Sequence, residues 1–447
     1  MFETVLVANR GEIARRIIRT VQRMGLKAVA VHSEADAKLP YVREADESVA
    51  IGPAAPAQSY RDVEALLEAA RQTGAQAVHP GYGFLAEDAA FATRVQKAGL
   101  VWVGPSPEAI EAMGDKIRAR NLVAEAGVPV SRGTTRPVGD IEEAVRSAHD
   151  IGYPVMVKAS AGGGGMGMAV ADDEAALRVE LERVRGFALR MFGDPSVLLE
   201  RFFPRVRHVE VQVLGLADGR VVALGERDCS VQRRNQKVAE ETPSPAVTPE
   251  LREQLFAAAV RAAEAVGYRN AGTVECLLDA DSGEVVFLEM NTRLQVEHPV
   301  TELVTGVDLV EEQLRVAAGD PPALDPAALP VPSGHALELR VYAEDPKRFL
   351  PGPGKITAWS EPSGEGVRVD SGYQAGDTVT PYYDPLMAKL CVWGPDRSAA
   401  LERARAAVAD FQVEGPKCNL PFFAELLADP EFVSGRYDTG LVGRMRR

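Results

Sequence analysis

Short apolar runs alternate with longer amphipathic stretches along the first part of the chain. The runs predict β-strands at residues 4–8, 28–31, 77–78 and 101–103. The stretches between them predict helices at residues 11–24, 60–73 and 87–98. Strands and helices that alternate in this way are typical of an open parallel sheet with helices packed on its faces.

The pattern changes after Ser106, which is followed by proline and therefore predicts the start of a helix. Residues 152–170 are expected to form two strands joined by a glycine-rich loop. Antiparallel strands are expected at residues 197–200, 209–214 and 221–225. Next come a helix at 249–266, strands at 272–278 and 285–290, and a helix at 309–318.

A proline-rich segment separates this middle region from the C-terminal part of the chain. Five prolines stand among the fourteen residues from 320 to 333, which predicts a linker. Beyond it, strands are expected at 336–342, 355–359 and 386–392, and a helix at 398–409. We predict an α/β chain of three domains, at residues 1–114, 115–332 and 333–447.

The most informative polar pattern lies at residues 288–297. Strong polar side chains occupy every second position, namely Glu289, Asn291, Arg293, Gln295 and Glu297. In an extended chain they would share one face. Carboxylate and amide oxygens suit a hard cation and a guanidinium suits an oxyanion, so the pattern indicates a metal beside an anion. The alternative is an edge strand with a charged outer face.

This segment has to bend if it is to serve one compact reaction centre. At about 3.3 Å per residue, the eight steps from Glu289 to Glu297 would cover about 26 Å in extended chain. We therefore expect a bend after about Asn291, which brings residues 293–297 back towards the metal.

A second carboxylate is expected beside Glu289. Glu275 lies one predicted strand upstream, and apolar residues flank both acids. Two carboxylates on neighbouring buried strands repel each other unless a cation lies between them. Mg²⁺, with Asn291 completing its ligands, is the expected cation, and a salt bridge to nearby arginines is the alternative.

A glycine-rich segment at residues 158–168 is the second strong signal. Lys158 precedes four consecutive glycines at 162–165. Such a run lets the backbone approach a polyphosphate and donate several amides. The segment lacks the Gly-Lys-Ser/Thr of a P-loop and the spacing of the Rossmann fingerprint. Because apolar strands flank it, a hairpin that closes over phosphates is favoured over a flexible linker.

Three weaker signals depend on their surroundings. Residues 207–212 alternate so that His208, Glu210 and Gln212 share one face, although a lone histidine is more often structural. Residues 232–237 form a cationic cluster, which is usually a solvated surface. Tyr82 lies in a turn rich in glycine and proline after a strand, at the edge where open α/β sheets bind ligands.

Composition excludes several classes of protein. With 46% hydrophobic and 26% charged residues, the chain is typical of globular proteins. It has no run of about 18 apolar residues and no basic-then-apolar start, so neither a membrane span nor a secretory signal is expected. The net charge of -14 argues against general nucleic-acid binding. Four widely spaced cysteines favour reduced thiols and a cytoplasmic location.

Together these segments resemble the biotin carboxylase branch of the ATP-grasp enzymes, over essentially the whole chain. The resemblance rests on ANRGEIA at 8–14, HPGYGFL at 79–85, MGDK at 113–116, KASAGGGGMGM at 158–168, RHVEVQV at 207–213, ERDCSVQRRNQK at 226–237, GTVE at 272–275, LEMNTRLQVEHPVTE at 288–302, GHALELR at 334–340 and PYYDPLMAKL at 381–390. It implies an ATP-grasp fold with an N-terminal open parallel sheet, a glycine-rich lid at about residues 131–204 and a C-terminal, mainly antiparallel β domain.

The resemblance also implies a reaction and its participants. ATP, bicarbonate and biotin on a carrier protein would give carboxybiotin, ADP and phosphate by way of carboxyphosphate. Mg²⁺ is the implied metal, with Mn²⁺ as an alternative. Biotin would be a substrate on the biotin carboxyl carrier protein, because this chain has no Met-Lys-Met in the setting of a biotinylated lysine.

Residue roles follow from the resemblance position by position. The implied metal ligands are Glu275, Glu289 and Asn291. ATP would contact Lys116, Lys158, Gly164, Gly165, Glu200, Arg201, Phe203, His208, Gln232, Asn235 and Leu277, together with Glu275 and Glu289. Bicarbonate would be held by Lys237, Arg293, Gln295 and Val296. The catalytic residues would be Arg293, Lys237, Arg340 and Glu297, the last as the base that activates bicarbonate. Tyr82 and Arg340 would face biotin.

Several positions depart from the common family pattern. Met166 stands where the lid usually carries Arg or Lys, and Asn235 replaces a frequent histidine beside the nucleotide. Arg23 and Glu365 occupy positions where dimeric members tend to carry Glu and Phe. The usual homodimer would therefore be absent or built differently.

The expected partners are a separate carrier protein and separate carboxyltransferase subunits. Acyl-CoA carboxylase, acting on acetyl-CoA or propionyl-CoA and supplying malonyl-CoA for fatty acid synthesis, is the favoured assembly. The biotin carboxylase component of a urea or pyruvate carboxylase is an alternative. Another ATP-grasp ligase that joins a carboxylate to an amine, and a non-catalytic nucleotide-binding regulator, are the remaining hypotheses.

Overall fold

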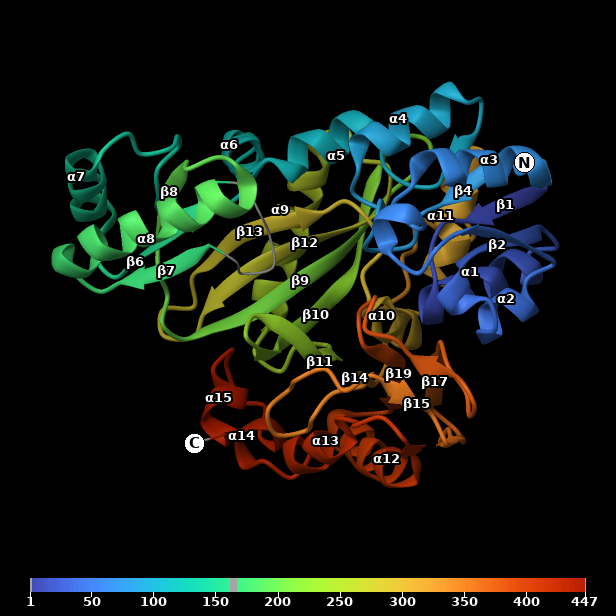
Figure 1. The fold of residues 1–447 in the computed structure, drawn as a ribbon. Helices are drawn as coiled ribbons and strands as arrows, with labels where there is room; N and C mark the ends of the chain where they lie inside the picture. Colours follow the sequence, from blue (N-terminus) through green and yellow to red (C-terminus); the bar gives the residue numbers. More distant parts are fainter. Residues whose placement is uncertain (1, 161–166, 447) are drawn as a thin grey trace.

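The computed structural model describes residues 2–160 and 167–446. Its N-terminal part is a parallel sheet in the order β3-β2-β1-β4-β5 (Figure 1). The strands are β1 (Thr4–Val7), β2 (Lys27–Ser33), β3 (Glu47–Gly52), β4 (Ala77–His79) and β5 (Val101–Trp102). The helices around it are α1 (Gly11–Arg23), α2 (Pro40–Glu44), α3 (Val63–Thr73), α4 (Ala89–Lys97) and α5 (Pro107–Gly114).

Both faces of this sheet are buried, as its apolar strands require. Val5 and Val7 pack into one core, whereas Leu6 between them packs into another. The predicted open parallel sheet is therefore confirmed. The predicted helix start is confirmed too, because the Ser106 side chain accepts a hydrogen bond from the amide of Ala109.

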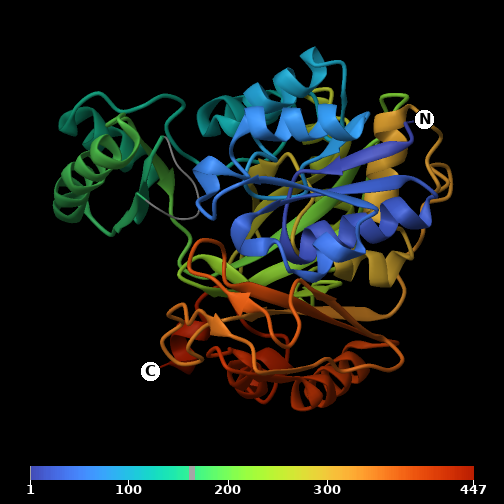
Figure 2. The ribbon, with the colours of Figure 1, turned by 45° about the vertical axis from the view of Figure 1, so that its right-hand side comes forward.

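The next part of the chain stands apart from the rest (Figures 1 and 2). After α6 (Lys116–Glu125), three antiparallel strands in the order β7-β6-β8 pack with two helices around a separate core. These elements are α7 (Ile141–Ile151), β6 (Val155–Ala159), β7 (Met168–Ala171), α8 (Glu174–Phe192) and β8 (Val197–Arg201). We call residues 131–204 the lid.

The largest sheet has eight antiparallel strands in the order β13-β12-β9-β10-β11-β14-β19-β17. Their bounds are β9 (Val206–Gly215), β10 (Val221–Arg233), β11 (Gln236–Thr242), β12 (Asn270–Asp279), β13 (Val285–Asn291), β14 (His335–Tyr342), β17 (Val367–Ser371) and β19 (Leu386–Gly394). Because β14 pairs with β11, this central sheet runs on past the predicted linker. The division into three domains stays a prediction.

Helices and short strands complete the molecule around the central sheet. The helices are α9 (Pro249–Glu264), α10 (His298–Thr305), α11 (Leu309–Ala318), α12 (Arg397–Asp410), α13 (Leu420–Leu426), α14 (Pro430–Val433) and α15 (Leu441–Met445). The short strands form the pairs β15 (Gly354–Lys355) with β18 (Thr378–Val379) and β16 (Ala358–Ser360) with β20 (Gln412–Glu414). The segment 320–333 contains neither helix nor strand, as predicted for a linker.

Three expectations about elements were wrong or incomplete. The strand expected at 221–225 continues to Arg233, because Gly225 lies at a β-bulge within β10 and does not end it. The cationic cluster at 232–237 covers the end of β10, a tight turn at 234–235 and the start of β11. The strand expected at 355–359 is split between β15 and β16, which belong to different pairs. Some elements were not predicted at all: helices α2, α6, α7, α8, α10, α13, α14 and α15 and strands β3, β11, β17, β18 and β20.

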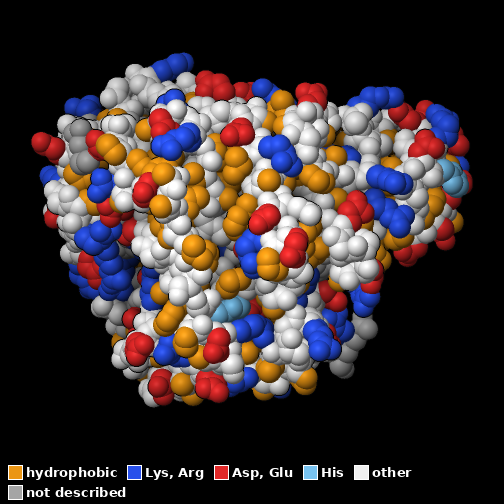
Figure 3. Space-filling view, turned by 180° about the vertical axis from the view of Figure 1, so that it is seen from behind, with side chains coloured by type: hydrophobic (Ala, Val, Ile, Leu, Met, Phe, Trp, Pro, Cys, Tyr) orange, Lys and Arg blue, Asp and Glu red, His pale blue; other side chains and the backbone are white. Residues whose placement is uncertain are grey.

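Acidic and basic side chains are interspersed over the face of the molecule seen in Figure 3. Among the described residues, no helix combines the length and the apolar character needed to cross a membrane.

The continuous sheet makes a prediction about stability. Leu337 on β14 is fully buried in the core, so Leu337→Ala should lower the free energy of unfolding by about 2–5 kcal/mol. Leu329→Ala, at a position that is 36% exposed, is the matched control and should change it by about 0.5 kcal/mol or less. Urea denaturation measures both. Equal losses in the two variants would contradict the assignment of β14 to the core.

Candidate active site

Acidic side chains form a row across three neighbouring strands of the central sheet. Glu275 on β12 lies opposite Glu289 on β13 and opposite Glu210 on β9. Residues directly opposite each other in antiparallel strands point to the same face. The pairing of Glu275 with Glu289 on neighbouring strands is therefore as predicted.

A single, largely buried lysine joins three carboxylates beside this row. The Nζ atom of Lys237 lies 2.6 Å from Glu210, 2.8 Å from Glu275 and 2.7 Å from Glu297. An ammonium group has three N–H donors, so each donor has one carboxylate partner. Burial lowers the pKa of Lys237, but the three carboxylates raise it well above its ordinary value, so the lysine stays charged. We call these four residues the lysine cluster.

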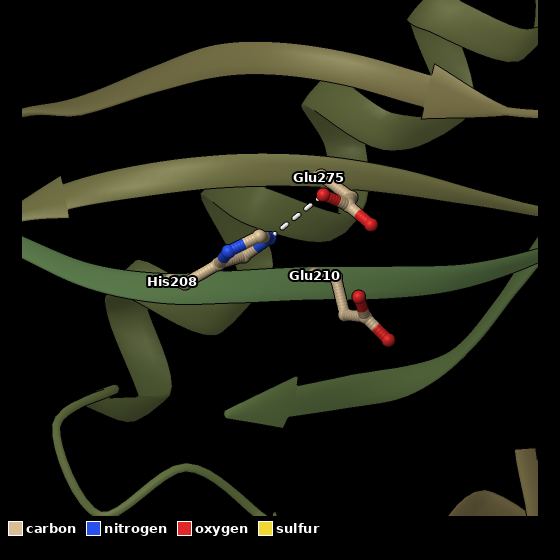
Figure 4. Close-up of side chains that lie close together, drawn as sticks. All are labelled: His208, Glu210 and Glu275. Carbon is tan, nitrogen blue, oxygen red and sulfur yellow. Dashed lines mark ion pairs between the residues drawn. The ribbon is translucent and has the colours of Figure 1, made fainter. Parts of the chain in front are cut away.

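His208 extends the lysine cluster towards the lid. Its Nε2 lies 2.8 Å from Glu275, and Figure 4 shows His208 and Glu210 on β9 beside Glu275 on β12. The side-chain amide of Gln232 lies 2.8 Å from the other ring nitrogen. Burial lowers the pKa of His208, whereas Glu275 raises it, and the net shift is upward.

Two groups of residues in this region have the spacing of metal ligands. One is His208, Glu210 and Glu275, and the other is Glu210, Cys229 and Glu297. The ammonium of Lys237 already bonds Glu210 and a second carboxylate in both groups. A bound metal would therefore have to displace an existing cation at either place.

Glu289 differs from Glu275 in its surroundings. Glu275 accepts hydrogen bonds from Lys237, from Asn291 at 2.8 Å and from Gln295 at 3.0 Å. Burial raises the pKa of Glu275, but the lowering by Lys237 and His208 is larger, so the pKa lies well below its usual range. Within residues 2–160 and 167–446, the side chain of Glu289 has neither a hydrogen bond nor an ion pair, although its main chain belongs to the β12–β13 ladder.

The charge of Glu289 is not fully compensated. Burial and the neighbouring Glu275 raise the pKa of Glu289, and Lys116 opposes them. A divalent cation between Glu275 and Glu289 would remove this repulsion, so the pair fits the predicted metal. Asn291 lies beside them, but its carbonyl oxygen accepts a hydrogen bond from Arg293.

The chain bends after Asn291, as predicted, because β13 ends there and α10 begins at His298. The bend folds Arg293 back onto its neighbours. Its guanidinium donates to Asn291 at 2.9 Å, to Gln295 at 2.7 Å and to Glu87 at 2.8 Å. Glu87 comes from the N-terminal part of the chain and was not predicted, although it closely follows the HPGYGFL turn.

Glu297 lies between two cations at the far end of the bend. It is fully buried and contacts Lys237 at 2.7 Å and Arg340 at 2.9 Å. Burial raises the pKa of Glu297, but Lys237, Arg340 and Arg227 lower it to well below its ordinary value. Glu240 lies 2.6 Å from Arg340, and burial raises the pKa of Glu240 to about 7.

Several residues predicted to contact ATP lie in the lid, at the start of α6 and on the central sheet. Lys158 on β6 forms a 2.6 Å ion pair with Glu200 on β8. Lys116 begins α6, where burial lowers its pKa although Glu289 raises it. Leu277 pairs with His208 across β12 and β9.

Other predicted contacts are spread more widely. Arg201 donates to the carbonyl of Tyr153, and Phe203 is half-buried just after β8. Asn235 is exposed at the β10–β11 turn, with a positive φ of 65°. Gly164, Gly165 and Met166 lie outside the described residues.

The two residues predicted to face biotin have different partners. The Tyr82 hydroxyl donates to Glu12, whereas Arg340 bonds Glu240 and Glu297. The carbonyl of Val296 accepts a 3.0 Å hydrogen bond from Lys389. Glu12 and Lys389 were not predicted from the sequence.

The fold and the site define an ATP-grasp ligase, and comparison with known proteins identifies the family. Three family models match: "Biotin carboxylase, N-terminal domain" at residues 1–110, "Carbamoyl-phosphate synthase L chain, ATP binding domain" at 115–324 and "Biotin carboxylase C-terminal domain" at 338–444.

Relatives of similar length agree with these models. Biotin carboxylase 2 of Bacillus subtilis is 50% identical over 98% of this chain and 98% of its own length. One pyruvate carboxylase subunit of Methanothermobacter thermautotrophicus is 48% identical over 100% of this chain and 91% of its own. A solved structure also matches, that of the biotin carboxylase domain of the Hydrogenobacter thermophilus 2-oxoglutarate carboxylase. It is 42% identical, covers 99% of this chain and 98% of its own, and has a TM-score of 0.94. That domain was solved as a dimer with MgADP, ADP and bicarbonate. The chain belongs to the biotin carboxylase family, whose members are ATP-dependent ligases.

The ion pair between His208 and Glu275 can be tested by titration. In the native protein, the pKa of His208 should lie above about 6.5 because Glu275 stabilises the imidazolium. In Glu275→Gln the carboxylate is gone while burial remains, so this pKa should fall below about 6.5. NMR titration of the six histidines measures it.

Glu264→Gln, an exposed position on α9, is the control and should leave the titration of His208 unchanged. The interpretation fails if Glu275→Gln also leaves it unchanged.

Proposed function

We propose that this biotin carboxylase activates bicarbonate with ATP at the lysine cluster and carboxylates biotin that is carried on a separate protein. The observation that supports it most is the position of Lys237. This lysine contacts both Glu275, which is predicted to bind the metal, and Glu297, which lies in the bend predicted to bind bicarbonate. One cation thus connects the two halves of a site where a nucleotide and a small anion would react.

Bicarbonate would bind beside the bend at residues 293–297. Arg293 offers a planar fork of donors to an oxyanion, and Lys237 adds a second cation. In the structure both are paired with carboxylates, Arg293 with Glu87 and Lys237 with its three acids. An entering anion would take over some of these donors, while the Gln295 side chain and the Val296 main chain complete its contacts.

Glu297 would remove the proton from bicarbonate. Lys237 and Arg340 keep the pKa of Glu297 low, which makes it a weak base as it stands. When Lys237 turns its donors to bicarbonate, this stabilisation of the carboxylate weakens and the pKa of Glu297 rises. The proton would then pass from the bicarbonate hydroxyl to the Glu297 carboxylate as a bicarbonate oxygen attacks the γ-phosphorus of ATP, and ADP would leave as carboxyphosphate forms.

The metal ligands would be Glu275 and Glu289, with Asn291 beside them. Mg²⁺ bound there, or Mn²⁺ in its place, would offset negative charge on the transferring phosphoryl group. Lys116, Lys158 and His208 would hold the phosphates, with the lid segment that includes Gly164 and Gly165. The base and ribose would contact Glu200, Arg201, Phe203, Gln232, Asn235 and Leu277. Lys158 would exchange its partner Glu200 for phosphate.

Biotin would enter between the N-terminal and C-terminal parts of the chain. Arg340 would stabilise the oxyanion that forms on the ureido group of biotin, with Tyr82 nearby. After bicarbonate is phosphorylated, the breakdown of carboxyphosphate would release CO₂ and phosphate. Phosphate would take the ureido proton, and the ureido nitrogen would attack CO₂ to give carboxybiotin.

The assembled complex would contain a biotin carboxyl carrier protein and carboxyltransferase subunits. We favour an acyl-CoA carboxylase that supplies malonyl-CoA. We place it in the cytoplasm, since the four cysteines are free thiols and the reaction consumes ATP. Pyruvate as acceptor is the second candidate, because a relative of similar length is a pyruvate carboxylase subunit. A homodimer, as in the dimeric relative, is also part of this proposal, and it would be built differently at Arg23 and Glu365.

The activity itself is tested by ATP hydrolysis. The purified protein should hydrolyse ATP only when bicarbonate is present, and free biotin should stimulate the rate. Hydrolysis that biotin does not stimulate would favour a ligase that joins a carboxylate to an amine. No hydrolysis at all would favour a regulator that only binds nucleotide.

Two substitutions test the anion side of the site. Arg293→Ala and Glu297→Ala should each lower the turnover of free biotin about 10²-fold or more. Arg293→Ala removes the guanidinium that would bind bicarbonate, and Glu297→Ala removes the base. ATP affinity, measured by calorimetry, should change about threefold or less in each. Arg269→Ala, at an exposed position, is the control and should behave as wild type. A matching loss of ATP affinity would count against these roles.

A further inference from the structure

A buried lysine outside the lysine cluster lies on the same face of the central sheet. Lys389 on β19 is opposite Arg340 on β14 and opposite Asp370 on β17. The three side chains therefore form a row that points to one side of the sheet. Lys389 has no exposed surface.

The ammonium of Lys389 contacts the bend of the active site directly. It donates a 3.0 Å hydrogen bond to the carbonyl of Val296. Val296 lies between Gln295, whose side chain contacts Glu275, and Glu297, whose side chain contacts Arg340. The bond to the Val296 carbonyl therefore restrains the main chain between these two side chains.

The same ammonium reaches the N-terminal part of the chain. It forms a 3.0 Å ion pair with Glu12 on α1, and the other carboxylate oxygen of Glu12 accepts a hydrogen bond from the Tyr82 hydroxyl. The Tyr82 ring centroid lies 6.0 Å from Lys389. Asp370 is more distant, at 4.0 Å, and has Arg368 as its nearer partner at 2.7 Å.

Lys389 thus connects segments that are far apart in the sequence. Its ammonium donates to Val296 in the bend and forms an ion pair with Glu12 in the first helix, and Asp370 is the next nearest acid. A lysine that only neutralised Glu12 would not need to bond a main-chain carbonyl. A lysine that only held the bend would not need an ion pair with the residue that fixes Tyr82.

We propose that Lys389 is a positioning residue, which holds the Val296 carbonyl so that Gln295 and Glu297 face bicarbonate, and which holds Glu12 so that Tyr82 faces biotin. This inference rests on the proposed function. It assigns to one buried ammonium the relative placement of the bicarbonate and biotin subsites.

The main alternative is that Lys389 serves only as a counter-charge for Glu12. Lys389→Met would then act by leaving a buried carboxylate without its cation, which is strongly destabilising. The double variant Glu12→Gln/Lys389→Met separates the two explanations, because it removes both charges and leaves the Val296 carbonyl without its donor.

The experiment measures the melting temperature, the ATP dissociation constant and the KM values for bicarbonate and free biotin. In Lys389→Met, the KM for bicarbonate should rise about tenfold, the size expected for a lost hydrogen bond to a charged donor, with ATP affinity within about twofold of wild type. Lys417→Met, an exposed lysine in the same part of the chain, is the control.

The double variant decides the case. We expect its melting temperature to recover relative to Lys389→Met, while the KM for bicarbonate stays about tenfold above wild type. Recovery of the KM to within about twofold would overturn the positioning role. Glu12→Gln alone should raise the KM for biotin and leave the KM for bicarbonate within about twofold, and an equal rise in both would also overturn it.

A failure of the proposed function would be visible in the wild-type protein. If wild type showed no bicarbonate-dependent ATP hydrolysis, the function itself would be wrong, whereas a failure of the inference leaves wild-type activity intact and appears only in the variants.

Discussion

The site depends on one largely buried ammonium group, that of Lys237, which is bound by three carboxylates from three different segments. Glu210 comes from β9, Glu275 from β12 and Glu297 from the bend before α10. Removing one partner from such a buried cluster would leave a charge uncompensated, which typically costs about 3–5 kcal/mol. The lysine therefore fixes the places of all three acids, and with them the two sides of the site.

Further cations continue this arrangement away from Lys237. Arg227 bonds Glu210 at 2.6 Å and Arg340 bonds Glu297, so both acids are shared between two cations. The partners come from every part of the chain: Glu87 from the N-terminal part holds Arg293, and Arg340 belongs to a strand beyond the linker. The central sheet has to cross the linker because the site needs side chains on both sides of it.

Much of the site could be predicted because its signals are local. Alternation placed Glu289 and Asn291 on a strand, and chain length alone required the bend that follows Asn291. The β10–β11 hairpin was missed because Gly225 was taken as a strand end, whereas it forms a bulge. Helix α8 was missed although Asp173 caps its start and Gly193 its end, so a search for caps would have found it.

Contacts between distant segments left no such signal. The partnership of Lys237 with Glu210, Glu275 and Glu297 depends on strand order and register, and the links from Glu87 to Arg293 and from Glu12 to Lys389 join segments far apart in the sequence. No spacing along the chain encodes these contacts.

The most direct test of this account is to locate Mn²⁺ by anomalous diffraction in crystals grown with a non-hydrolysable ATP analogue. Since Lys237 already fills the space among Glu210, Glu275 and Glu297, the account predicts a peak between Glu275 and Glu289. A peak among His208, Glu210 and Glu275, with Lys237 displaced, would contradict it.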